Sequence, residues 1–223
     1  MMIHGNSIGK KFHEDGSVRR FPGNTVVAPI RPGCSAYDVM LQLRQMFTDA
    51  GLDENYILLP EDSYHMTVLD WVCDQVRDAE HWPIGLPLDA PMEIADRYIS
   101  EAIAPVPMPG SVKMKFDRLS VSKNAVLALL QPADEIEKEK LWCFRNAAAD
   151  AAQLHLPNHE SYRFHISLAY TRVIPEGEQA AKLEKLTERI DAYLQEQIAF
   201  ETGVPYMAYF DDMLAFSPNP IPR

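Results

Sequence analysis

Two short segments, about 100 residues apart, share one pattern, and this repetition limits the possible folds more than any other feature of the chain. They are residues 63–69 (SYHMTVL) and 163–169 (RFHISLA). In each, a histidine and a hydroxyl residue alternate with apolar residues, which is typical of a β-strand. Because residues i and i+2 of a strand share a face, His65 is expected beside Thr67, and His165 beside Ser167. The intervening apolar residues are expected to face the core; they are Met66, Val68, Ile166 and Leu168.

Periodicity and capping signals predict the remaining elements. Apolar residues at helical spacing indicate helices over 36–50, 91–103, 134–154 and 183–198. Ser35 and Asp134 are plausible N-caps, Pro91 suits a first turn, and Gly51 suits the position after a C-cap. Further strands are expected over 25–30, over 114–121 and 125–130 as a hairpin, and over 206–216. Pro29 should end the first of these strands or lie at a sheet edge.

The order strand–helix–strand occurs on both sides of the proline-rich segment 104–110. We therefore expect an α+β fold, and a single domain over 1–223 made of two lobes. The first lobe is expected at about 20–103 and the second at about 111–216. Each lobe would carry one His-x-hydroxyl strand after its main helix, as in an internal duplication.

Charge and cysteine content exclude several classes of function. The net charge of −11, from 21 basic and 32 acidic residues, argues against binding to DNA or long RNA, which requires many phosphate contacts. A small anionic substrate held by a few local groups remains compatible with this charge. Cys34, Cys73 and Cys143 are scattered and form no C-x-x-C, as expected for a reducing cytoplasm. Neither a signal peptide nor a membrane-spanning run is apparent.

A pair of histidines on one surface can act on a phosphodiester by acid–base catalysis. One imidazole accepts a proton from water while the other protonates the leaving oxygen, without a metal ion or cofactor. Thr67 and Ser167 could donate hydrogen bonds to the non-bridging oxygens. His159-Glu160-Ser161 has the same spacing, but it lies in a loop-like segment without flanking apolar residues, so we discount it.

The segments 65–68 (HMTV) and 165–168 (HISL) resemble the paired H-x-T/S-x signatures of the 2H phosphoesterase superfamily. That superfamily includes RNA 2′,3′-cyclic phosphodiesterases and proteins related to the 2′-5′ RNA ligases. Segments 11–16 and 21–25, with Tyr64 to Thr67, further resemble its bacterial DUF1868 subgroup. The resemblance implies two pseudo-symmetric β-sheet lobes with outer helices around a central cleft. It also implies a catalytic role for His65, Thr67, His165 and Ser167.

Other residues are weaker candidates for substrate binding. If the second motif strand is regular, Arg163 shares the face of His165 and could contact phosphate, although a rim salt bridge explains it equally well. Ser63 is placed likewise before His65. Asn24 and Thr25 follow a Pro-Gly turn and match the subgroup. Two aromatic residues could stack a base, although packing is their commoner role: Trp71 and Tyr162.

Three functions stay open at this point. The first is a metal-independent phosphodiesterase acting on a cyclic or small phosphodiester, such as a 2′,3′-cyclic nucleotide or an RNA end. The second is a sensor that binds a nucleotide or phosphate in the same cleft without catalysis. The third is a metal-dependent hydrolase with His65 and His165 as ligands, near Asp70 and Asp74 in sequence. Four histidines have no assigned role: His4, His13, His81 and His155.

Overall fold

The computed structural model describes residues 2–222. In chain order its elements are β1 (Gly23–Pro29), α1 (Ser35–Asp49), β2 (Tyr56–Leu58), the 3₁₀ turn η1 (Glu61–Ser63), β3 (His65–Cys73), α2 (Met92–Ile103), β4 (Lys113–Val121), β5 (Ala125–Pro132), α3 (Glu135–Ala152), β6 (His165–Thr171), α4 (Glu178–Gln195), β7 (Phe200–Glu201) and β8 (Tyr206–Phe210). The strands form one sheet in the order β7-β4-β5-β6-β3-β1-β8, with β2 pairing to β6. The predicted α+β class is confirmed.

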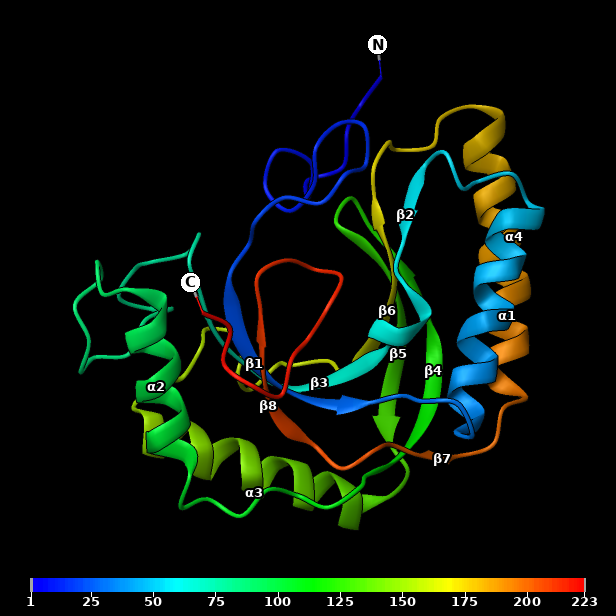
Figure 1. The fold of residues 1–223 in the computed structure, drawn as a ribbon. Helices are drawn as coiled ribbons and strands as arrows, with labels where there is room; N and C mark the ends of the chain where they lie inside the picture. Colours follow the sequence, from blue (N-terminus) through cyan, green and yellow to red (C-terminus); the bar gives the residue numbers. More distant parts are fainter. Residues whose placement is uncertain (1, 223) are drawn as a thin grey trace.

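The two motif strands, β3 and β6, join the halves of this sheet. They pair antiparallel only where Met66 lies opposite Ile166. By contrast, β3 pairs with β1 over most of its length, and β6 pairs likewise with β5. Figure 1 shows the strands β1, β3 and β8 crossing the direction of β4, β5 and β6. The sheet therefore bends where the motif strands meet.

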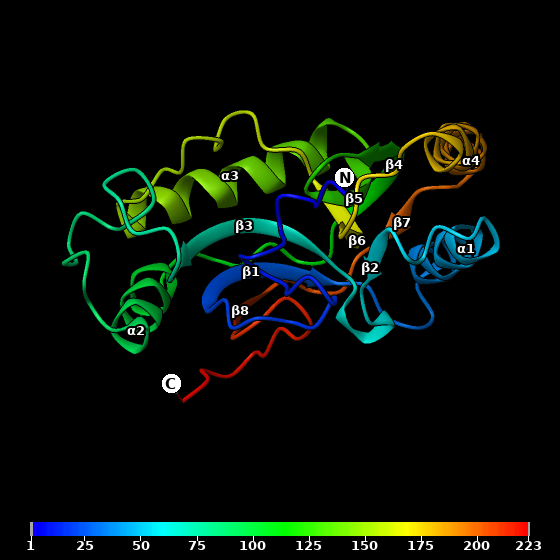
Figure 2. The ribbon, with the colours of Figure 1, turned by 90° about the horizontal axis from the view of Figure 1, so that it is seen from above.

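Helices cover the outer side of each half. The helices α1 and α4 contact each other, and α4 also packs on β4. The helices α2 and α3 contact each other and pack on β1, β3 and β5. Figure 2 shows these two pairs as separate groups, with α1 and α4 together at one end of the molecule.

Each half of the sheet takes elements from both sides of the segment 104–110. The strand β2 pairs with β6, and β8 returns to pair with β1. The ranges 20–103 and 111–216 therefore do not by themselves delimit the two halves. Long-range pairing of this kind is invisible to local sequence patterns, because it depends on contacts between residues far apart in the chain.

Most predicted boundaries agree with the structure, but α4 begins at Glu178 and ends at Gln195, whereas the predicted helix covers 183–198. Asp134 caps α3 by accepting a hydrogen bond from the Glu137 amide, and Gly51 follows α1 with a φ of +65°. The N-cap of α1 is Cys34, one residue before the expected Ser35. The strand β1 ends at Pro29 as predicted.

The last strand is shorter than predicted, because β8 ends at Phe210 instead of continuing to 216. The Asp212 carboxylate accepts a hydrogen bond from the Leu214 amide at 2.8 Å, which turns the chain. The segment 211–217, here called the C-terminal loop, returns to pair Ser217 with Tyr209. In Figure 1 this loop (red) and residues 2–21, the N-terminal arm (dark blue), both lie on the inner side of the bent sheet.

The core lies behind the motif strands as alternation predicts. Met66, Val68, Ile166 and Leu168 are all completely buried. Among residues 2–222, no helix combines the length and the apolar character needed to cross a membrane.

Candidate active site

The two motifs meet across the β3–β6 junction. With Met66 opposite Ile166 in an antiparallel pair, His65 comes opposite Ser167, and Thr67 comes opposite His165. Each histidine therefore faces the hydroxyl residue of the other motif, as local twofold symmetry requires. All four motif residues line one cavity of about 360 Å³. These four are His65, Thr67, His165 and Ser167, and they are called the motif residues below.

Both imidazole rings are held in the same way, by the carbonyl two residues earlier. The distance from His65 Nδ1 to the Ser63 carbonyl is 2.7 Å, and from His165 Nδ1 to the Arg163 carbonyl it is 2.8 Å. A carbonyl oxygen can only accept, so each Nδ1 carries a proton. Each Nε2 is thus the nitrogen left for proton transfer in the cavity.

A matching β-bulge follows each motif. Along β3, Val26 pairs with Leu69 but Val27 pairs with Thr67, which leaves Val68 unpaired. Along β6 the same shift leaves Leu168 unpaired. A bulge inserts one residue and reverses the faces beyond it. The next residues of the two strands to line the cavity are consequently Asp70 and Tyr170, each five positions after its histidine.

Burial makes His65 a weak base compared with an ordinary histidine. It lowers the pKa of His65 from 6.5 to about 4, and the nearby charges of His165 and Arg31 act in the same direction, while the bond to the Ser63 carbonyl opposes them. Part of the cover is Phe216 of the C-terminal loop, whose ring centroid is 4.1 Å from that of His65. The imidazole of His65 is therefore neutral at pH 7.

Within residues 2–222, a single Lys or Arg side chain lines the cavity, and it comes from the N-terminal arm. Lys11 Nζ donates to the Tyr170 hydroxyl at 3.3 Å. It also lies 5.0 Å from the ring centroid of Phe21 and 4.9 Å from that of Tyr170. This cation–π contact with two rings fixes a positive charge at the cavity wall, where it can neutralise a phosphate.

A second positive charge lies behind the cavity, on α3. Arg145 is 1% exposed, and its guanidinium donates to the carbonyls of Val68 at 2.6 Å and His159 at 3.0 Å. It stacks 4.4 Å from the ring centroid of Tyr162, which lines the cavity. Burial, which is the main cause, and the Asp70 carboxyl raise the pKa of Tyr162 well above its usual range, so its hydroxyl stays protonated. The Tyr162 hydroxyl is buried near Thr67, but it makes no hydrogen bond of good geometry within residues 2–222.

The other candidates from the sequence have different positions. Asn24 and Thr25 line the cavity, but their side chains serve the fold. Asn24 Nδ2 donates to Asp96 Oδ1 at 2.7 Å, and Thr25 Oγ1 donates to the Leu69 carbonyl at 3.0 Å. Trp71 is buried in the core and borders the cavity.

Arg163 and Ser63 act through their backbones. The Arg163 side chain is exposed and does not line the cavity, because β6 begins only at His165. Ser63 lies in η1, where its hydroxyl donates to the Pro60 carbonyl at 2.6 Å. The prediction from strand alternation that the side chains of these two residues face the cavity is therefore wrong. Their backbone carbonyls instead orient the two histidines.

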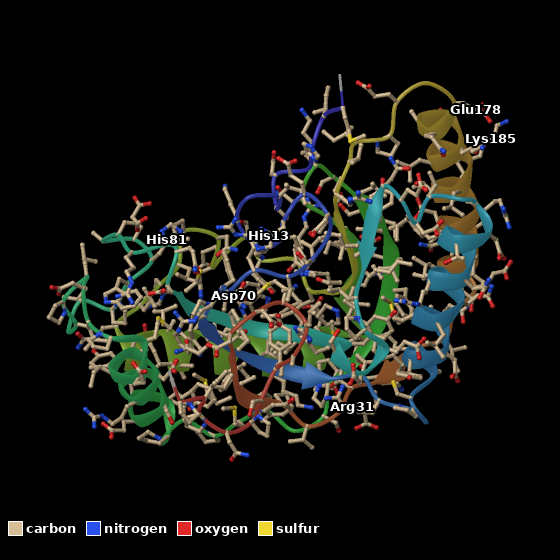
Figure 3. All side chains as sticks on the ribbon, turned by 45° about the horizontal axis from the view of Figure 1, so that its top comes forward. His13, Arg31, Asp70, His81, Glu178 and Lys185 are labelled. Carbon is tan, nitrogen blue, oxygen red and sulfur yellow. The ribbon has the colours of Figure 1, made fainter. Side chains whose placement is uncertain are left out.

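The remaining histidines lie outside the cavity. His159 is buried, and its Nε2 donates to Asn146 Oδ1 at 2.9 Å, so its role is structural. Figure 3 shows His81 at the outer rim and His13 in the N-terminal arm, while Asp70 lies on β3 in the middle of the molecule. Within residues 2–222, no group of three or more His, Cys, Asp or Glu side chains is arranged to hold a metal ion.

Several cavity residues were missed by the sequence reasoning. Strict alternation would point residues 69 and 169 into the cavity, on the same face as the motif residues. Because of the bulges, Asp70 and Tyr170 face the cavity instead. A signal was present, because two consecutive apolar residues interrupt the alternation in each strand: Val68-Leu69 and Leu168-Ala169. Lys11 and Phe216 come from irregular segments, and the strand predicted over 206–216 misassigns Phe216, because β8 ends at Phe210.

Comparison with known proteins agrees with this geometry. A family model described as "2H-phosphodiest: Domain of unknown function (DUF1868)" matches residues 11–125, which is more than half of the chain. The match includes Lys11, the first motif and Asp70, and it ends before the second motif. The comparison with curated proteins gave no match.

Two solved structures are similar to the chain. A conserved protein of unknown function from Agrobacterium tumefaciens is 25% identical, with a TM-score of 0.86 over 96% of this chain and 90% of that one. A Thermus thermophilus protein is 10% identical, with a TM-score of 0.42 over 86% of each chain, too low to support an argument. The first likeness supports a 2H-like fold. Both motifs lie in one cavity, and the family model matches more than half of the chain. The chain therefore belongs to the 2H-phosphodiesterase-like DUF1868 family.

Proposed function

We propose that this protein is a metal-independent phosphodiesterase that hydrolyses a cyclic or small phosphodiester, such as a 2′,3′-cyclic nucleotide or the cyclic end of an RNA. The observation that carries the proposal is the register of β3 and β6, which sets each histidine opposite the hydroxyl residue of the other motif within one cavity. A phosphate between the strands would meet an imidazole and a hydroxyl from each side. Membership of the family supports the same chemistry.

His65 suits the role of general base. Its burial keeps the imidazole neutral at pH 7, and the Nδ1 proton held by the Ser63 carbonyl leaves the lone pair on Nε2. That lone pair takes a proton from water as the water oxygen bonds to phosphorus. A base with so low a pKa is weak, but it is available in its active form at neutral pH.

His165 then acts as the general acid. Its Nδ1 proton is held by the Arg163 carbonyl, so the proton that it transfers is the one on Nε2. As the bond between phosphorus and the leaving oxygen breaks, this proton passes to that oxygen and yields an alcohol and a phosphomonoester. His65 ends protonated and His165 neutral, and exchange with solvent water restores both.

The hydroxyls and the lysine stabilise the charge on the phosphate. The Ser167 hydroxyl has no hydrogen-bond partner among residues 2–222, and Thr67 lies opposite His165, so both can donate to non-bridging oxygens. Lys11 adds a positive charge at the cavity wall, where it can interact with the phosphate. A cavity of about 360 Å³ suits a ligand of mononucleotide size.

Turnover of 2′,3′-cyclic nucleotides and of bis(p-nitrophenyl) phosphate, in the presence of EDTA, tests the proposal. We expect activity in the wild type, and a loss of about 10²–10⁴-fold in His65→Ala and in His165→Ala. His155→Ala is the matched control, because this exposed histidine lies outside the cavity. Tight binding of nucleotides without turnover would instead indicate a sensor, and activity abolished by EDTA would contradict metal independence.

A further inference from the structure

The bulges put two different side chains at equivalent positions of the cavity. Tyr170 is fully engaged, because its hydroxyl donates to Met213 Sδ at 3.2 Å and accepts from Lys11. The side-chain carboxyl of Asp70, its counterpart on β3, accepts no hydrogen bond from any residue within 2–222. The local twofold symmetry of the site is therefore broken at this position. One strand carries a hydrogen-bonded phenol, and the other carries a carboxyl without a hydrogen-bond donor among residues 2–222.

The groups around Asp70 leave its oxygens to the cavity. On β1 the opposite residue is Thr25, whose hydroxyl donates to the Leu69 carbonyl instead. Lys11, His165 and Arg145 are near enough to interact with the carboxyl electrostatically, but none forms an ion pair with it. Burial raises the pKa of Asp70, and these three groups oppose that effect.

A carboxyl at this position is unfavourable for an anionic ligand. Asp70 is half-buried and its side chain lines the cavity. An ionised carboxylate there repels the phosphate that the motif residues are arranged to hold. This repulsion is offset if the substrate carries a hydrogen-bond donor that reaches Asp70 while its phosphate lies between the histidines.

We infer that Asp70 is a specificity-determining residue that accepts a hydrogen bond from an N–H or O–H group on the alcohol portion of the substrate. The inference rests on the proposed function and narrows its substrate class. A nucleoside fits, because it carries such donors on its base and its sugar, whereas a second phosphate at this position would be repelled. Phe21, Tyr170 and Phe216 supply apolar surface on the same cavity for a base or sugar.

The test is the substrate preference of Asp70→Asn, which keeps the shape of the side chain and removes its charge. The preference is the ratio of kcat/KM for 2′,3′-cyclic AMP to kcat/KM for bis(p-nitrophenyl) phosphate, which has no N–H or O–H donor on its alcohol portion. We expect this ratio to fall about tenfold, mainly through KM for the nucleotide, since a charged acceptor is replaced by a neutral amide oxygen, which accepts a weaker hydrogen bond. Asp62→Asn is the matched control, because it removes one negative charge from an exposed residue outside the cavity.

The outcomes separate the two hypotheses. A loss of equal size on both substrates would overturn the inference and leave the phosphodiesterase in place, whereas a wild type inactive on both would overturn both. Cyclic phosphates lacking the 6-amino group or the 5′-hydroxyl identify the donor. If Asp70→Asn no longer lowers kcat/KM on one of these analogues, the group missing from that analogue is the donor. If the substitution lowers kcat/KM equally on every analogue and on bis(p-nitrophenyl) phosphate, the inference is refuted.

Discussion

Replacing Phe216 with alanine should raise the pKa of His65, because this ring is part of the cover that dehydrates the imidazole. The ring centroids of Phe216 and His65 are 4.1 Å apart, and Phe216 also packs on Phe210 at 5.2 Å. Phe216 belongs to the C-terminal loop, outside the motif strands, and precedes Ser217, which pairs with Tyr209. Removal of the ring would admit water to His65 while leaving the motif strands intact.

The size of the effect follows from the pKa itself. The difference between 6.5 and about 4 corresponds to about 3 kcal/mol in favour of the neutral imidazole. Burial is the largest cause of this difference, and Phe216 provides one wall of the burial. We expect the substitution to increase the proton affinity of His65 at least tenfold, which is about 1.4 kcal/mol.

The pH dependence of kcat/KM measures this change directly. In the wild type, activity should fall as the pH drops toward about 4, because protonated His65 cannot accept a proton from water. In Phe216→Ala this acidic limb should move toward pH 6.5. NMR titration of the imidazole signal, assigned with a His65→Gln variant, reports the same pKa without any assumption about catalysis.

Phe216→Leu is the matched control, because it retains most of the apolar cover and should keep the limb close to that of the wild type. The reasoning would be refuted if Phe216→Ala folded normally, with unchanged backbone NMR signals outside the loop, and still titrated near pH 4.

Three further predictions concern the motif residues and the buried arginine. First, the folded protein should lose about 3 kcal/mol of stability as the pH falls from about 6.5 to about 4, since the unfolded chain protonates His65 first; urea unfolding at several pH values should show a smaller loss in His65→Gln. Second, Thr67→Val and Ser167→Ala should each lower kcat/KM about 10²-fold with little change in the thermal midpoint, and unchanged kinetics in both would remove the hydroxyls from the mechanism. Third, Arg145→Met should lower the free energy of unfolding by about 2–4 kcal/mol, because it leaves two buried carbonyls without a donor; a change below about 0.5 kcal/mol in urea unfolding would contradict that role.

Local patterns were sufficient for most of the secondary structure. The alternation in 63–69 and 163–169 placed the motif residues on strands, and the cap at Asp134 and the glycine at 51 marked helix ends. Such signals are readable because they arise from the geometry of a few consecutive residues. They failed where the chain leaves regular structure, as at Arg163, which lies before β6 begins.

The sequence by itself determined which residues form the strands of the site and which of their faces is apolar. Only the tertiary structure decided what meets across the strands: the register that sets His65 opposite Ser167, the bulges that turn Asp70 and Tyr170 inward, and the approach of Lys11 from the N-terminal arm. Alternation is a property of one strand and needs no partner. Register and bulges depend on pairing between segments distant in the chain, and the position of the arm depends on packing that no local period records.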